Sequence, residues 1–106
     1  MPANGEYEEP GPTREEIDAS RGLLALEFGA NGCGFCQAAQ PLIEAALAGR
    51  PEIRHMKVGD GPGRPLGRSF RVKLWPTLIL LRDGAEVARI VRPTSEPNLT
   101  SEITAL

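Results

Sequence analysis

The chain has 106 residues, of which 41% are hydrophobic and 25% are charged, as is usual for one globular domain. Its net charge of -2 argues against a general nucleic-acid-binding protein, which needs a basic surface for phosphate groups. No apolar run approaches the roughly 20 residues of a membrane helix, and no basic segment followed by an apolar stretch opens the chain. We therefore expect a monomer in the cytoplasm that contacts neither nucleic acid nor a membrane.

Residues 1–12 differ in composition from the rest of the chain. They contain three prolines, two glycines and three glutamates, and almost nothing that a core could bury. We expect a disordered N-terminal segment over 1–12 and one folded domain over 13–106.

The first half of this domain shows three structural signals. Thr13 is a helix N-cap with Glu15 and Glu16 in the first turn, and this helix should end near Arg21. Residues 23–28 form an almost continuous apolar run, typical of a strand that is covered on both faces. Residues from 34 onward favour a helix that stops at Gly49.

The second half favours strands. Asp83-Gly84 is a strong hairpin signal, so the strands on either side of it should pair antiparallel. The elements expected here are a strand over 52–58, a short weak helix over 65–71, strands over 77–82 and 86–92, and a final helix that has Pro97 in its first turn.

The two cysteines of the chain, Cys33 and Cys36, fall between the buried strand and the long helix. A helix N-terminus stabilises an anion, so a thiolate at Cys33 is favoured, and the thiolate is the nucleophile in disulfide exchange. Residues three apart on a helix share a face, so Cys36 can reach the Cys33 sulfur and displace a bound partner. A permanent disulfide would close a loop of only two residues and stabilise the fold little.

Other functions remain open at this point. The cysteine pair could bind a metal, but a zinc site needs four ligands and only His55 could join the two thiols, so the site would require a dimer. His55 is otherwise expected at the surface or at a strand edge. The domain could also be a binding module that has lost the chemistry, or a glutaredoxin-like variant.

Several segments in register resemble the thioredoxin family. The residues "LLALEFGANGCGFC" (23–36) are similar to the family's strand, loop and active-site CGPC, and Pro41 lies where the family has a proline in its active-site helix. "RVKLWPTLILLRDGAEVARI" (71–90) is similar to the family's proline-threonine segment and hairpin.

This resemblance implies a thioredoxin-like α/β fold, in which helices flank a central mixed sheet of about four strands, because the family's first strand has no clear counterpart here. It also implies a thiol-disulfide oxidoreductase without a bound cofactor. Its substrates would be protein disulfides, and an electron donor such as a thioredoxin reductase would regenerate it.

The resemblance also assigns roles to individual residues. Pro76 falls on the family's cis-proline, which faces the cysteines. Glu27 falls on a buried acid that takes the proton of Cys36, and a lone buried carboxylate usually has a raised pKa. The alternative is that Glu27 turns to solvent at a strand edge. Lys57 matches a lysine near that acid, although a solvated lysine would fit equally well.

The departures from the family concern the substrate-binding surface. Gly32 stands where the family has tryptophan, Phe35 where it has proline, and Trp75 where it has isoleucine. We expect Gly32, Gly34, Phe35, Trp75 and Pro76 to contact substrate, with Trp75 serving as an apolar platform or filling the space left at Gly32.

A further departure leaves the substrate open. After the last strand the family has a glycine that contacts substrate, whereas this chain has Arg92 followed by Pro93. The expected cytoplasmic location favours a reductant over an isomerase.

Overall fold

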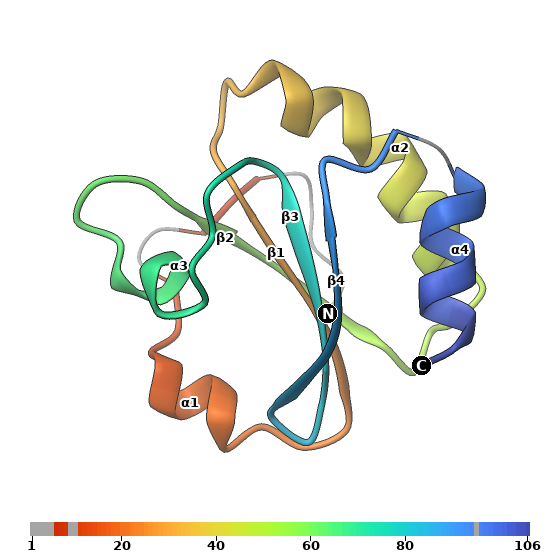
Figure 1. The fold of residues 1–106 in the computed structure, drawn as a ribbon, viewed down its shortest axis with the longest axis horizontal. Helices are drawn as coiled ribbons and strands as arrows, with labels where there is room; N and C mark the ends of the chain where they lie inside the picture. The colour runs from red at the N-terminus through yellow and green to blue at the C-terminus, as the bar shows by residue number, and fades with distance from the viewer. Residues whose placement is uncertain (1–5, 9–10, 95) are drawn as a thin grey trace.

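The computed structural model describes residues 6–8, 11–94 and 96–106, and in this part of the chain helices cover both faces of one mixed sheet (Figure 1). Its elements in chain order are α1 (Arg14–Asp18), β1 (Leu23–Gly29), α2 (Gly34–Ala48), β2 (Arg54–Gly59), α3 (Pro65–Ser69), β3 (Thr77–Arg82), β4 (Ala85–Val91) and α4 (Glu96–Thr104). The strand order is β2-β1-β3-β4. β1 is parallel to β2 and antiparallel to β3, and β3 is antiparallel to β4. The predicted four-stranded sheet is confirmed.

The central strand β1 is buried on both faces, as its apolar run predicts. Ala25 faces the cluster formed with α2 and α4, whereas Leu24, Leu26 and Phe28 face the cluster that includes residues of α1 and α3. Since side chains alternate along a strand, Glu27 points to the same side as Ala25, toward α2. The strand thus delivers a carboxylate to the underside of the helix that carries Cys36.

Two local predictions are confirmed in detail. Thr13 caps α1 in a capping box with Glu16, although the helix ends at Asp18 rather than near Arg21. Asp83 and Gly84 both have positive φ, at 50° and 83°, as the tight turn between β3 and β4 requires. A Cβ at Gly84 would lie 2.1 Å from the Asp18 carbonyl oxygen, so glycine also lets the hairpin tip pack against the end of α1.

Part of the N-terminal segment lies against the sheet, whereas its composition predicts disorder. Residues 1–5 and 9–10 of the expected disordered segment lie outside the described residues, but residues 6–8 lie against the sheet. The Glu8 N–H donates to the Lys57 carbonyl oxygen and the Gly59 N–H donates to the Glu8 carbonyl oxygen, both at 2.9 Å. Tyr7 is only 6% exposed. The buried Tyr7 side chain and the backbone bridge at Glu8 hold residues 6–8 against β2. The composition of residues 1–12 does not predict this contact.

None of the helices in the described ranges is long and apolar enough to cross a membrane.

Candidate active site

Cys33 occupies the N-cap of α2, which is the position that its sequence context predicts. Its Sγ accepts a hydrogen bond from the Cys36 backbone N–H at 3.2 Å. Cys33 is partly exposed and Cys36 is only 1% exposed, and neither forms a disulfide. The Cys33 sulfur is therefore accessible at the start of the helix, while the Cys36 sulfur is buried.

The thiol of Cys36 is difficult to ionise. Burial, followed by a hydrogen bond and the charge of Cys33, raises its pKa to about 11, although hydrogen bonds from the Ala30 backbone and from Tyr7 act in the opposite direction. The Tyr7 hydroxyl and the Cys36 sulfur meet above Gly29, where a Cβ would lie 2.6 Å from the hydroxyl and 2.8 Å from the sulfur. Only glycine leaves room for both groups at the end of β1.

The Tyr7 hydroxyl also donates a hydrogen bond to Glu27 Oε2. The pKa of Tyr7 is raised well above its ordinary value by burial and by the charge of Glu27, so the phenol keeps its proton. Tyr7 therefore connects the sulfur of Cys36 to the carboxylate of Glu27.

Glu27 is fully buried and has several polar partners. Gln40 Nε2 donates to Oε2 at 2.6 Å, and His55 Nε2 lies 2.8 Å from Oε1. Burial raises the pKa of Glu27, but the hydrogen bonds from His55, Tyr7 and Gln40 outweigh burial and lower it below the ordinary value. Glu27 is therefore a carboxylate in the resting protein, and His55 supplies a hydrogen to it.

The pKa expected for Glu27 needs correction, and the solvent-exposed alternatives for Glu27, His55 and Lys57 are wrong. Glu27 is neither alone nor turned to solvent, and its pKa is lowered rather than raised. His55 lies on β2, an edge strand of the sheet as expected, but its side chain is only 10% exposed and contacts Glu27, so the surface alternative is wrong. Lys57 is buried, donates to Gln40 Oε1 at 2.7 Å and lies 4.5 Å from the centre of the Tyr7 ring. We call Tyr7, Glu27, Gln40, His55 and Lys57 the Glu27 network.

Two members of the Glu27 network, Tyr7 and Gln40, were missed by the sequence reasoning. Gln40 lies one turn after Cys36, and this spacing places it on the same side of the helix. Tyr7 offers no such signal except that it is the single tyrosine of the chain, set among residues that favour disorder.

The predicted substrate-binding residues lie around the start of α2 and the start of β3. Gly32 has a φ of +87°, which favours glycine, and a Cβ at Gly32 or Gly34 would meet no atom within 4 Å. Phe35 is 60% exposed. The Trp75–Pro76 peptide bond is cis.

Arg92 links these residues. Its guanidinium lies 4.0 Å from the centre of the Phe35 ring, and its Nε donates to the Trp75 carbonyl oxygen at 2.9 Å. Its backbone N–H donates to the Pro76 carbonyl oxygen at 2.8 Å, and its φ is +47°, in the region that favours glycine. Where the family has a glycine, this chain therefore has an arginine in a left-handed backbone conformation. The side chain of this arginine covers Phe35, which lies between the two cysteines.

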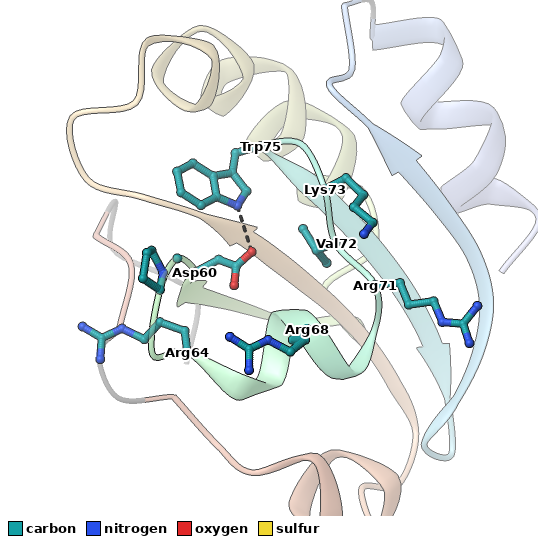
Figure 2. Close-up of a pocket in the computed structure, with 9 residues that line it drawn as sticks. Asp60, Arg64, Arg68, Arg71, Val72, Lys73 and Trp75 are labelled. Carbon is teal, nitrogen blue, oxygen red and sulfur yellow. Dashed lines mark hydrogen bonds between the residues drawn. The ribbon is translucent and has the colours of Figure 1, made fainter.

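A cavity of about 750 Å³ opens beside Trp75 (Figure 2). The indole Nε1 donates to Asp60 Oδ2 at 2.9 Å, which fixes the orientation of the Trp75 ring. We call this cavity the basic pocket, because its charged lining residues are Asp60, Arg64, Arg68, Arg71 and Lys73.

In the part of the chain that the structure describes, no three His, Cys, Asp or Glu residues are grouped so that they could hold a metal ion. His55, the one residue expected to join the thiols, contacts Glu27 instead.

The fold and the site together define a protein of the thioredoxin fold with a cysteine pair at a helix start. The family model for thioredoxin matches residues 11–105, and this chain therefore belongs to the thioredoxin family.

Individual relatives agree with this assignment. The chain is 34% identical to thioredoxin of Chlamydia pneumoniae over 82 residues, which cover 77% of this chain and 80% of that protein. It is 41% identical to thioredoxin of Chlamydia trachomatis over 71 residues, covering 66% and 69% of the two chains. The structure of thioredoxin 2 from Pseudomonas aeruginosa in its reduced form superposes with a TM-score of 0.87 at 52% identity and covers 94% of this chain and 93% of its own.

The family and the cysteine pair establish a thiol-disulfide oxidoreductase. Thioredoxins in general act on protein disulfides and are reduced by thioredoxin reductase.

Proposed function

We propose that this protein reduces disulfide bonds of other proteins, with Cys33 as the attacking cysteine and Cys36 as the resolving one. The observation that carries this assignment is the unequal placement of the two sulfurs. Cys33 is accessible at the N-cap of α2, whereas Cys36 is buried against Tyr7. The helix N-terminus favours a thiolate at Cys33.

The first exchange joins the substrate to the protein. The Cys33 thiolate attacks one sulfur of the substrate disulfide, a Cys33–substrate bond forms, and the other substrate sulfur leaves as a thiolate that takes a proton. Phe35, Trp75 and Pro76, with Gly32 and Gly34, form the surface that the substrate chain would contact.

The second exchange releases the substrate and requires Cys36 to lose its proton. A thiol with a pKa of about 11 is ionised to only about one part in 10⁴ at pH 7, so a path for the proton matters. We propose that Tyr7 passes its hydroxyl proton to Glu27 while it accepts the proton of Cys36. The Cys36 thiolate then attacks Cys33 Sγ, the Cys33–Cys36 disulfide forms, and the second substrate sulfur leaves.

The lowered pKa of Glu27 defines its part in this step. A carboxylate that is stabilised by His55, Tyr7 and Gln40 holds a proton only briefly. It therefore relays the proton toward the departing substrate thiolate and returns to the ionised form.

The remaining parts of the proposal concern the setting of the reaction. The oxidised pair is returned to the dithiol by an electron donor such as a thioredoxin reductase, and the protein works as a monomeric reductant in the cytoplasm. The cycle starts from two reduced thiols. The cytosol keeps thiols reduced, and this supports the proposed setting.

The test is reduction of insulin by dithiothreitol with wild type and two variants. We expect Cys33→Ser to be inactive, and Cys36→Ser to accumulate a covalent adduct with insulin that mass spectrometry detects. Equal activity of the two variants would contradict the assignment. Equilibration of wild type with glutathione buffers tests the direction: a midpoint potential above that of the cytosolic glutathione pool would contradict the role of reductant.

A further inference from the structure

We propose that the basic pocket binds an acidic segment of the protein whose disulfide is reduced at Cys33, so that the enzyme prefers substrates with Asp and Glu near the reactive cysteine. This inference rests on the proposed function for its partner, but its binding step can be measured without catalysis. The geometry points to it through the position and the charge of the pocket.

Trp75 belongs both to the pocket and to the predicted substrate-binding surface. Trp75 forms one wall, and its carbonyl oxygen is held by Arg92, which covers Phe35 between the two cysteines. A chain bonded to Cys33 can therefore run past Trp75 into the pocket. Its volume of about 750 Å³ is within the usual range of ligand sites.

The charge of the pocket is unbalanced. Figure 2 shows Trp75 above Asp60, Arg64 and Arg68 below it, and Lys73 and Arg71 to the right, with the Arg71 guanidinium directed away from Trp75. Within the described residues, Arg68, Arg71 and Lys73 have no ion-pair partner. Arg14, Arg50 and Arg89, by contrast, each pair with an acid close in sequence.

Asp60 is the one acidic residue among those that line the pocket, and part of its carboxylate is used by Trp75. Its Oδ2 accepts the hydrogen bond of the Trp75 indole at 2.9 Å. Figure 2 shows one oxygen of its carboxylate directed toward Trp75 and the other toward α3, where Gly67 and Arg68 lie. Arg68 and Lys73 pair with no acid of the described chain, so they remain available to an anion.

The backbone at Arg71 is set by the end of α3. Among the described residues, the non-glycine residues with positive φ are Asp83, in the hairpin turn, and two arginines, Arg71 and Arg92. Arg71 follows α3, where the Val72 N–H donates to the Gly67 carbonyl oxygen and glycine would be the usual residue. The left-handed conformation of Arg71 thus belongs to the end of α3, and Arg92 lies outside the lining of the pocket.

The occupant that fits is a polypeptide carrying carboxylates. Arginine donates paired hydrogen bonds to carboxylates, and several partly screened contacts together change binding by about tenfold.

Binding is tested with a cysteine-free peptide rich in glutamate. Trp75 is the single tryptophan of the chain and lines the pocket, so its fluorescence reports occupancy. We expect the glutamate peptide to change this fluorescence, with an affinity about tenfold above that of a lysine peptide of the same length, and the difference should shrink with added salt.

Variants locate the effect. Arg68→Glu with Lys73→Glu should abolish the preference, whereas Arg21→Glu with Arg54→Glu, at the other end of β1, should keep it. Equal binding of the two peptides by wild type, or a preference that survives in the pocket variant, would overturn the proposal.

Catalysis is then measured on disulfide peptides with acidic, neutral or basic flanks. We expect kcat/KM for the acidic peptide to exceed that for the basic peptide by about tenfold in wild type only. Reduction of the neutral peptide reports the proposed function by itself. If wild type reduces the neutral peptide without favouring the acidic one, the inference about the pocket fails and the proposed function stands.

Discussion

The Glu27 network and the basic pocket differ in whether their charged groups have partners within the protein. In the network, one carboxylate buried under α2 contacts Tyr7, Gln40 and His55. In the pocket, Arg68, Arg71 and Lys73 are not paired with any acid of the described chain. The charge of Glu27, which is fully hydrogen-bonded within the protein, serves the reaction of the protein itself. The unpaired cations of the pocket are available to a partner.

The largest expected effect concerns the hydroxyl of Tyr7. Tyr7→Phe keeps the ring but removes the link between Cys36 and Glu27, so release of the mixed disulfide should slow by about 100-fold near neutral pH. The loss should shrink at alkaline pH, where hydroxide removes the proton of Cys36. Stopped-flow measurement of the second exchange over a pH series checks this.

The matched control is Ser20→Ala, which removes the hydroxyl that donates to the Ile17 carbonyl oxygen, away from the site. A loss in Tyr7→Phe that stays constant with pH would indicate a purely structural role for Tyr7.

The next effect is the stability that Glu27 contributes. Because its pKa is lower in the folded protein than its usual 4.5, its contribution is complete above that value and is lost as the pH falls through the folded-state pKa. Glu27→Gln should lower the free energy of unfolding by about 1–3 kcal/mol at pH 7 and by less in acid. Urea unfolding over a pH series measures this difference.

Glu44→Gln, on the exposed side of α2, is the control and should change the free energy of unfolding by less than about 0.5 kcal/mol. A difference between wild type and Glu27→Gln that does not change with pH would contradict a lowered pKa.

A smaller effect is expected for Arg92, which contacts Phe35 and Trp75. Arg92→Gly relieves the positive φ but removes the contact with Phe35, so the free energy of unfolding should change by less than about 1 kcal/mol. A double-mutant cycle with Phe35→Ala should give a coupling energy of about 0.5–1 kcal/mol. Zero coupling would show that the guanidinium does not stabilise Phe35.

The smallest effect is expected in the pocket. Arg68→Gln and Lys73→Gln break no ion pair within the described chain, so the free energy of unfolding should stay within about 0.5 kcal/mol of wild type, or rise as repulsion is relieved. Arg50→Gln is the comparison, because Arg50 donates to the Ile103 carbonyl oxygen at 2.8 Å and should cost about 1 kcal/mol. A loss of that size in Arg68→Gln would mean that the pocket cations serve the fold.

The parts of this molecule that could be predicted from sequence are those set by neighbouring residues. The apolar run of β1, the cap at Thr13, the turn at Asp83-Gly84 and the helix start at Cys33 all follow from local patterns. The fold as a whole followed from the resemblance that these patterns carry.

The contents of the Glu27 network could not be predicted, because they depend on strand register and on long-range contacts. Register places Glu27 beside Lys57 on β2, and it places His55 two residues away on the same face. Tyr7 reaches Glu27 from 20 residues away, through a segment whose composition favours disorder. The basic pocket also collects its charges from a loop, a short helix and the residues before Pro76.

The irregularity at Leu80/Leu81, where β3 and β4 change register, bears on how the molecule behaves at high concentration. β4 is the last strand of the sheet and carries the exposed side chains of Val87 and Val91, which could nucleate pairing with a neighbouring copy. A bulge bends such a strand, and Glu86 and Arg89 add charge to it, so that a second β4 cannot align along its length. Straightening this strand should therefore promote fibril growth while leaving the sulfur chemistry untouched.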